Sequence, residues 1–400
     1  MRRNRITSAV AIAALGSVML AVWVASASWR ERQFLKHASL SQLQRAAAQQ
    51  PYDAAVYRYL GIKQRAEGDA AAAARSFQHA ATIDPNDEES WLGWSSATAQ
   101  VTGTRDATAI LMLYLTRHGR SSRGHLALAR LYHRNNLTSA AAAEAVRAYR
   151  LDPALSDAAL LAAEDLNKEH AYEESQSILT AAIKAHPDDW RLQQAMGDLL
   201  FEENLVPDSI PFYTRAVRLR PREGVALLGL GRALLTAGGT QQVQQSLSVL
   251  QSAEAIMPAD PRVWLALGQS LALNGRPADA RTQLDRAEAA APQSLIVHYQ
   301  LARVDLQLGD RAASAKEAQL HESLLALHNQ RVTLTGLVNA QPRDASLWLR
   351  LAQVCDRQRD ITAARAACAD ALAIAPHLGA AISLSRSLNR LPPVETNKGD

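Results

Sequence analysis

The sequence is poor in the residue types and motifs that mark most enzyme and metal sites. Only two of its 400 residues are cysteine, and no histidine pair lies near them, which leaves too few ligands for a metal site. The formal net charge is +4, so the overall charge points neither to nucleic acid nor to a membrane surface. The motifs G-x-S-x-G and H-E-x-x-H, a phosphate loop and a strand followed by G-x-G-x-x-G are all missing. We therefore expect a protein that is not an enzyme and that holds no cofactor.

Aromatic residues are also scarce, at 5%, whereas apolar residues as a whole make up 48%. That combination fits helix pairs packed through alanine. Prolines recur mostly at an interval of 34 residues, with Gly119 in the place of one of them. The repeating positions are Pro51, Pro85, Pro153, Pro187, Pro221, Pro258, Pro292, Pro342 and Pro376. Because proline lacks an N–H and disfavours helix in the residue before it, each position marks the end of a helix.

Helix caps follow the prolines in the same register. Two residues after six of them stands a side chain that can accept hydrogen bonds from the first turn of a helix. These residues are Asp53, Asp87, Asp189, Asp260, Ser294 and Asp344. Each interval also holds two apolar stripes, as in Trp264, Leu267, Gly268 and Leu271, followed by Ala280, Leu284 and Ala287. One helix pair cannot bury both stripes alone, so we expect the pairs to stack.

This pattern resembles the tetratricopeptide repeat family, whose signature of W-x2-L-G-x2-Y, A-x3-F and a closing proline has a period of 34 residues. The resemblance covers roughly residues 54–376. It implies an all-α solenoid, a right-handed superhelix of about nine helix-turn-helix units, with a concave face that binds ligands. It implies no chemistry.

Other segments flank the expected solenoid of residues 54–376. They are a membrane anchor or signal segment at 1–29, a linker with a half-repeat capping helix at 30–53, a C-terminal capping helix at 377–390 and a disordered tail at 391–400. The series of repeating prolines, with Gly119 in its place, is here called the proline ladder. Two of its intervals exceed the 34-residue period: 37 residues from Pro221 to Pro258, and 50 residues from Pro292 to Pro342. The first makes residues 236–245 irregular, and we expect the turn at Gly238–Gln242 to absorb the extra residues. The second makes residues 311–342 irregular, as one long helix or as a helix followed by a shorter one.

Residues 8–27 carry no charge and follow Arg2, Arg3 and Arg5. At about 1.5 Å per residue, a helix of that length just spans a hydrocarbon core of roughly 30 Å. The basic residues before it favour a cytosolic N-terminus and periplasmic repeats, as in a single-pass protein of the inner membrane. The sequence Ala25-Ser26-Ala27 also resembles a cleavage site. The alternative is therefore a soluble periplasmic protein after cleavage near Ala27.

The first helices of the expected repeats carry a partly basic row on the concave face. The candidate partner-binding residues are Arg58, Arg65, Arg123, Arg130, His133, Arg134, Arg232, Arg262 and Arg303. Acidic residues interrupt the row in the fourth and fifth units, at Asp157, Glu164, Asp198 and Glu202. Guanidinium groups bind carboxylates and other anions through paired hydrogen bonds, so the row suits an acidic peptide or an anionic polysaccharide. Ordinary solvated charge is the alternative.

Cys355 and Cys368 fall on the two buried stripes of the last unit, as a disulfide or as two small buried thiols. Taken together, these features predict a non-enzymatic, membrane-anchored scaffold that binds other envelope proteins through its concave face. By the family resemblance, such a scaffold would serve envelope assembly, secretion, or the synthesis and export of exopolysaccharide. The alternative is an accessory subunit that binds an anionic glycan or peptide directly in the groove. No nucleic acid partner is expected.

Overall fold

The structure, a computed structural model, describes residue 33 and residues 35–390. The regular structure in this part is helical and includes no strand, so the all-α prediction is confirmed. The predicted membrane segment at 8–27 and the predicted tail at 391–400 lie outside the described residues. Within the described part, no helix is both long and apolar enough to cross a membrane. The chain divides into two compact units, with the boundary between Glu203 and Asn204.

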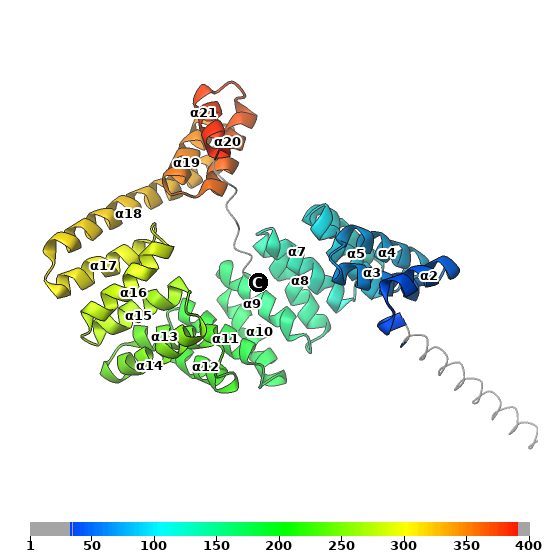
Figure 1. Ribbon diagram of the computed structural model, residues 1–400, viewed down its shortest axis with the longest axis horizontal. Helices are drawn as coiled ribbons and strands as arrows, with labels where there is room; N and C mark the ends of the chain where they lie inside the picture. The colour runs from blue at the N-terminus through cyan, green and yellow to red at the C-terminus, as the bar shows by residue number, and fades with distance from the viewer. Residues whose placement is uncertain (1–32, 34, 391–400) are drawn as a thin grey trace, which may run out of the picture. The chain divides into compact units, whose positions relative to one another are not determined.

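Unit 1, up to Glu203, is a row of helices in which each helix packs against the next (Figure 1). Its helices are α2 (Leu40–Gln49), α3 (Ala54–Ala66), α4 (Ala70–Ile83), α5 (Glu88–Val101), α6 (Thr104–Arg117), α7 (Ser122–Arg134), α8 (Thr138–Leu151), α9 (Ser156–Lys168), α10 (Tyr172–Ala185) and α11 (Trp190–Glu202). The helices that open successive repeats, α3, α5, α7, α9 and α11, also pack against one another. They therefore form one continuous face of unit 1.

Unit 2, from Asn204, is built in the same way. Its helices are α12 (Val206–Leu219), α13 (Gly224–Ala237), α14 (Thr240–Ile256), α15 (Pro261–Leu273), α16 (Pro277–Ala290), α17 (Leu295–Leu308), α18 (Arg311–Ala340), α19 (Ala345–Arg357), α20 (Ile361–Ile374) and α21 (Gly379–Asn389). Here α13, α15 and α17 form one row of first helices, and α19 packs against α21. The right-handed superhelix of about nine units stays a prediction.

The six predicted caps all stand at the N-cap positions of helices, and four of them make the expected bonds. Asp53, Asp189, Asp260 and Asp344 each accept a backbone N–H of the first turn. Asp87 instead accepts hydrogen bonds from the guanidinium of Arg58 and the hydroxyl of Ser90. Ser294 makes no side-chain cap bond. The predicted start of the helix is therefore correct at all six positions, but at Asp87 and Ser294 the side chain does not cap the helix.

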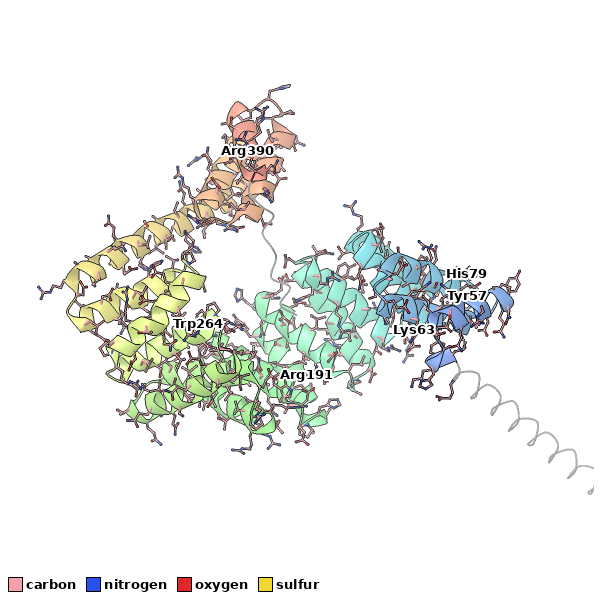
Figure 2. The ribbon with its side chains drawn as sticks, viewed as in Figure 1. Tyr57, Lys63, His79, Arg191, Trp264 and Arg390 are labelled. Atoms are coloured by element: carbon pink, nitrogen blue, oxygen red, sulfur yellow. The ribbon has the colours of Figure 1, made fainter. Side chains whose placement is uncertain are left out.

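A ring N–H in the first helix of several repeats donates to the carbonyl at the proline-ladder position, six residues earlier. The bonds run from Trp91 to Pro85 and from Trp348 to Pro342 at 3.0 Å, and from His125 to Gly119 and from His298 to Pro292 at 3.1 Å. Trp264, labelled in Figure 2, departs from this pattern. Its Nε1–H has no hydrogen-bond acceptor, because Arg286 donates to Pro258 O and lies over the indole ring, 4.4 Å from the ring centroid. In these repeats the residue six positions after the proline-ladder position is thus either tryptophan or histidine, and this position is here called the ring slot.

The longer steps of the proline ladder lengthen helices. α14 has 17 residues where α12 has 14, so the three extra residues extend a helix. The expectation that the turn absorbs them was wrong, because Thr240–Gln242 already belong to α14 and only Gly238 and Gly239 form the turn. Glutamine is a good helix former, which favours this outcome. The second irregular stretch contains one continuous helix, α18, of 30 residues.

The two ends of α18 belong to different packing environments. Its first part packs against α17, where His321 donates from Nδ1 to Leu295 O. Its last part joins the apolar core of α19, α20 and α21 through Leu334 and Val338. Figure 1 shows α18 as a single long helix between these two groups of helices.

Candidate binding groove

A hollow of about 600 Å³ lies among the first helices of unit 1 and is here called the basic groove. Four of the predicted arginines line it: Arg65 on α3 and Arg123, Arg130 and Arg134 on α7. The other lining residues are Leu92, Ser95, Ser96, Ala99, Leu111, Leu126, Ala127, Leu131, Ala154, Leu155, Ser156 and Asp157. The basic groove therefore combines a guanidinium row with leucine and alanine side chains.

The spacing of residues along α7 explains why its arginines line up. Arg123, Ala127, Arg130 and Arg134 follow one another at steps of four, three and four residues, which places them on one face of the helix. The opposite face carries Leu128 and Ala129, which are buried. Ala127 is small, so it leaves open space between the arginines above and below it. The same amphipathic pattern that buries α7 thus presents a basic row to the groove.

Carboxylates engage only part of the guanidinium row. Arg130 lies 2.8 Å from Asp157, and Arg123 lies 3.4 Å from Glu88. The side chains of these two arginines are still about half exposed, at 55% and 52%. Asp157 also pairs at 2.8 Å with Arg191, which Figure 2 labels, so this one carboxylate is shared between two guanidinium groups.

The two remaining arginines have no carboxylate partner in the described part of the chain. Arg65 lies over the ring of Phe77, 5.8 Å from its centroid, and Arg134 is exposed at the C-terminal end of α7. Exposed ion pairs such as those of Arg123 and Arg130 are worth only about 0–1 kcal/mol and exchange readily for a better anion. The groove is therefore able to accept a carboxylate-bearing ligand without first breaking a strong interaction.

The other predicted groove residues of unit 1 lie elsewhere. The Arg58 guanidinium pairs at 2.8 Å with Asp87 at the start of α5, and its side chain is only 20% exposed. It thus fastens one repeat to the next. His133 lies 2.8 Å from Asp165, whose side chain is fully buried on α9. Neither residue lines the basic groove.

The three predicted arginines of unit 2 do not gather in one place. Arg262 turns back onto its own cap residue, Asp260, at 2.7 Å. Arg303 lies over Tyr299 and lines a hollow of about 170 Å³ with residues of α13, α15 and α17. Arg232 is exposed on α13. The long basic row expected from the sequence is therefore concentrated in unit 1.

The two cysteines form no disulfide in the structure; both are free and buried. Their thiols have different surroundings. The Cys368 thiol donates to Ala381 O on α21, whereas Cys355 lies near Arg331 and Asp360. Burial raises the pKa of both thiols, which makes them less reactive.

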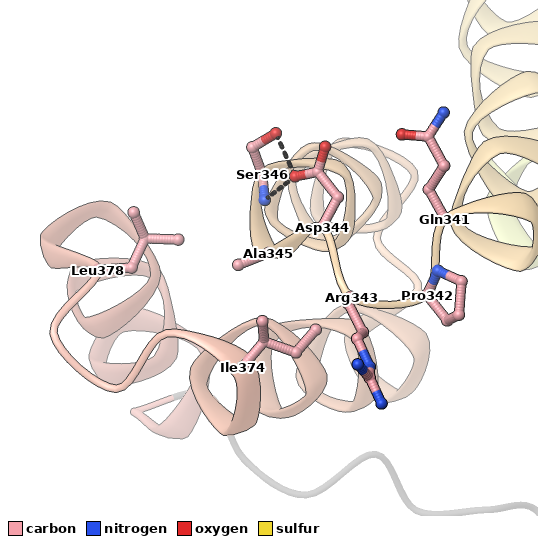
Figure 3. A pocket seen from close by; sticks show the side chains of 8 residues that line it. All are labelled: Gln341, Pro342, Arg343, Asp344, Ala345, Ser346, Ile374 and Leu378. Atoms are coloured by element: carbon pink, nitrogen blue, oxygen red, sulfur yellow. Dashed lines mark hydrogen bonds between the residues drawn. The ribbon is translucent and has the colours of Figure 1, made fainter.

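A wider hollow of about 740 Å³ lies beside the loops that join α18 to α19 and α20 to α21. Figure 3 shows Ile374 and Leu378 on one side of it and the Asp344 carboxylate on the other, where Ser346 donates to it. Asp344 is occupied as a helix cap, so the polar side chains of this hollow that remain for recognition include those of Gln341 and Arg343, both exposed. One group of possible metal ligands also occurs among the described residues, in unit 2: Glu288, His298 and Glu317.

Sequence patterns identified the arginines of the groove but missed its apolar residues. Leu92, Leu126 and Leu155 line the groove although they do not belong to the basic row. A sequence signal was available for two of them, because Leu126 follows Arg123 by three residues and Leu155 precedes Asp157 by two; Leu92, on α5, has no groove arginine or aspartate near it in the sequence. The acidic interruption at Asp157 was noted in the sequence, but its pairing with Arg130 depends on how α7 packs against α9.

Comparisons with known proteins identify the repeats directly. Residues 159–224 and residues 261–304 each match the tetratricopeptide repeat family. No curated protein matches the chain.

Several solved structures resemble the chain at low identity. PilW, described as a widely conserved type IV pilus biogenesis factor, is 21% identical, with a TM-score of 0.45 over 50% of this chain and 92% of its own. A MamA fragment from Desulfovibrio magneticus RS-1 is 20% identical, with a TM-score of 0.37 over 41% and 91%. Human IFIT1, in a dimer with PPP-AAAA, is 12% identical, with a TM-score of 0.45 over 84% and 94%. Likenesses at this level do not indicate what this chain binds. The family matches show tetratricopeptide repeats within residues 159–224 and 261–304.

Proposed function

We propose that the protein is a non-enzymatic scaffold whose basic groove binds an acidic peptide segment of a partner protein. The observation that carries this proposal is the gathering of four arginines and several leucines around one hollow of about 600 Å³. Stacked tetratricopeptide repeats commonly present such extended surfaces to other proteins. Guanidinium groups recognise carboxylates through paired, charge-assisted hydrogen bonds, each worth about 1.5–3 kcal/mol.

The apolar part of the lining favours a peptide over an anionic polysaccharide. Leu92, Leu126 and Leu155 offer surface to aliphatic side chains, which a peptide carries and a polysaccharide lacks. None of the residues that line the basic groove is aromatic, so the groove has no ring on which a sugar can stack. A peptide in which acidic and aliphatic residues alternate matches both parts of the lining.

The test compares two triple charge reversals of the full-length chain. The groove variant carries Arg123→Glu, Arg130→Glu and Arg134→Glu. The control variant carries Arg105→Glu, Arg120→Glu and Arg147→Glu, which are exposed arginines of unit 1 outside the groove. Both variants change the net charge equally, so long-range attraction of an acidic ligand falls by a similar amount in each.

The probe is a fluorescent peptide of about twelve residues, rich in Glu with Leu at every fourth position, and a counterpart with Gln in place of Glu. We expect the groove variant to bind the acidic peptide at least about tenfold more weakly than the control variant, since one charge-assisted bond is worth that factor. Binding of the Gln counterpart should be weak throughout. Equal losses in the two variants would refute the groove. Tighter binding of polygalacturonate than of the peptide would favour the glycan alternative.

We also propose that the scaffold works in the cell envelope, anchored in the inner membrane by residues 8–27 with its repeats in the periplasm. Support comes from the uncharged run and from the arginines before it. Cleavage near Ala27 is the alternative and would leave a soluble periplasmic protein. Fusion of alkaline phosphatase after Asp400 should give an active enzyme in bacteria, because that enzyme needs the periplasm for its disulfides. The control fuses, at the same position, a fluorescent protein that becomes fluorescent only in the cytosol. An inactive phosphatase fusion together with a fluorescent control fusion would contradict the periplasmic location.

A further inference from the structure

Three potential metal ligands from three successive helices of unit 2 converge at one point. They are Glu288 near the end of α16, His298 in the first turn of α17 and Glu317 in the second turn of α18. One ligand atom from each lies within 4.8 Å of the other two. The His298 side chain is fully buried, and Glu317 is 4% exposed. The group thus lies at the packed junction of two repeats.

The hydrogen bonds of His298 orient its ring for a ligand at Nδ1. The carbonyl of Pro292 lies 3.1 Å from Nε2, and a carbonyl can only accept, so Nε2 carries the proton. Nδ1 lies 2.8 Å from Glu317 Oε2, a hydrogen bond in which the two atoms share one proton, and a metal ion bound here would displace that proton. Histidines that bind metals usually donate their other N–H to a carbonyl or carboxylate in just this manner. The bond from Nε2–H to Pro292 O would therefore hold the ring in place with Nδ1 toward a metal ion.

The charges around His298 leave an excess of carboxylate. The Glu288 carboxylate has no hydrogen-bond or ion-pair partner among the described residues, and the residue is partly exposed. The guanidinium of Arg281, which interacts electrostatically with Glu317, is already paired with Asp285 and with the buried Asp305. Burial, followed by the charges of Glu317 and Asp310, raises the pKa of Asp305 against the effect of Arg281. Two carboxylates therefore face one imidazole in surroundings that are already acidic.

A second repeat provides a natural comparison, because it has the same histidine and glutamate without the third ligand. His125 Nδ1 lies 2.5 Å from Glu144, and Nε2 lies 3.1 Å from Gly119 O. The spacing of histidine and glutamate is 19 residues in both repeats. The position that corresponds to Glu288, four residues before the ladder position, is Leu115 in the earlier repeat. The unpartnered carboxylate is thus specific to the repeat of His298.

We propose that Glu288, His298 and Glu317 form a site for a divalent transition metal, with Zn²⁺ as the best match to one imidazole and two carboxylates. Such ligands bind Zn²⁺ at about 2.0–2.2 Å, which places tetrahedral ligand atoms about 3.4 Å apart. His298 Nδ1 and Glu317 Oε2 lie 2.8 Å apart, so a metal ion that displaced their proton would also separate them by about 0.6 Å, while Glu288 is partly exposed at the edge of the group. Three protein ligands leave one position for water. The bound ion would tie α16, α17 and α18 together.

The experiment uses the full-length chain, stripped with EDTA and exchanged into chelator-free buffer. Co²⁺ serves as the spectroscopic probe through its visible absorption, and ZnCl₂ is titrated calorimetrically. The variants are Glu288→Gln, which keeps the size of the side chain, and Glu288→Leu, which introduces the residue type of the earlier repeat. The control is His328→Ala, which removes an exposed histidine of the same helix, α18. Circular dichroism checks that each variant keeps its helix content.

We expect one tight equivalent of metal per chain, a rise in Tm with ZnCl₂, and at least a tenfold weaker affinity in both Glu288 variants. Loss of a residue that only hydrogen-bonds to a metal ligand lowers metal affinity by about 10–100-fold, and loss of a direct ligand should lower it by no less. The control should bind like the wild type. The proposal is overturned if ZnCl₂ leaves the Tm of the wild type unchanged, or if the tight equivalent survives both Glu288 variants. Two equivalents of equal affinity would also overturn it, because the pair at His125 would then bind without a third ligand.

Discussion

The closest helix packing in unit 1 leads to a prediction of defined sign. Phe77 on α4 is 1% exposed, and its ring lies between Gly61 on α3 and Gly93 on α5. A Cβ added at Gly93 would lie 2.6 Å from the nearest ring carbon, and one added at Gly61 would lie 3.0 Å from the ring. The ring therefore has no room to move away from either helix. We predict that Gly93→Ala destabilises this part of unit 1.

Two opposing effects set the magnitude for Gly93→Ala. Replacing glycine by alanine inside a helix stabilises it by about 0.5–1 kcal/mol, because the unfolded chain loses freedom. Overpacking a rigid core costs about 1–3 kcal/mol. Since the contact of 2.6 Å falls far inside the normal carbon–carbon separation, the cost lies in the upper part of that range. The net effect is a destabilisation of about 1–2 kcal/mol.

Gly336 provides the matched control. It lies inside α18, and an added Cβ there would meet no atom within 4 Å. Only the propensity effect applies, so Gly336→Ala should stabilise its helix by about 0.5–1 kcal/mol. The same chemical change is therefore expected to have opposite signs at two helical positions of one chain.

Hydrogen–deuterium exchange with mass spectrometry is the suitable assay, because repeat proteins unfold locally and a single global free energy is poorly defined. Peptides from α4 and α5 should exchange about five to thirty times faster in Gly93→Ala, whereas peptides around Gly336 should slow in Gly336→Ala. A Phe77→Leu background should remove most of the Gly93→Ala effect, since the clashing ring is gone. Slower exchange of α4 and α5 in Gly93→Ala would refute the reasoning.

The remaining predictions concern the cap at Asp260. Its carboxylate accepts the Arg262 backbone N–H at 2.8 Å, so Asp260→Ala should lower the free energy of unfolding around α15 by about 1 kcal/mol, measured by exchange at neutral pH. The hydrogen bond from the Arg262 side chain lowers the pKa of Asp260 below its ordinary value. The stabilisation is therefore complete above the unfolded pKa of about 3.9 and is lost as the pH falls through the lower folded pKa. A difference between wild type and Asp260→Ala that grew on acidification would contradict this sign.

The repeat fold could be predicted from sequence because its signals are local and redundant. A proline, a cap two residues later and an apolar stripe agree in most units, so where one signal is missing, as the proline is at Gly119, the others still mark the repeat. The prediction failed where one signal stood alone. At Gly238 and Gly239 the ladder step gave the number of extra residues but not their place, and helix propensity after the glycines decided it. For residues 311–342, by contrast, the alternative of one long helix was correct, and α18 has no internal proline to interrupt it.

The candidate groove was predictable only in part, for a physical reason. The position of an arginine on a helix face follows from its place in the repeat, and four of the nine predicted residues, Arg65, Arg123, Arg130 and Arg134, line one hollow. Whether a guanidinium then stays available depends on which carboxylate the neighbouring helix offers. Arg58 meets a partly buried Asp87, whereas Arg134 meets none. The availability of each guanidinium thus depends on ion pairs between residues about thirty positions apart in the sequence, such as Arg58 and Asp87. A single sequence does not show which of these pairs form.

The ring slot of the first helix shows how a repeat gains local properties while keeping its backbone. Tryptophan and histidine both supply the N–H that the ladder carbonyl requires, as Trp348 and His298 do. Indole ends there, whereas imidazole has a second nitrogen that faces the following helix and calls for a polar partner. Glu317 meets that need, and Glu288 then adds a charge that the pair alone does not require. Exchange of tryptophan for histidine, addition of Glu317 and addition of Glu288 all leave the helix packing unchanged, so the repeat pattern is compatible with each of them. The chemistry of a repeat therefore depends on the side chains around this ring position and does not follow from the repeat pattern.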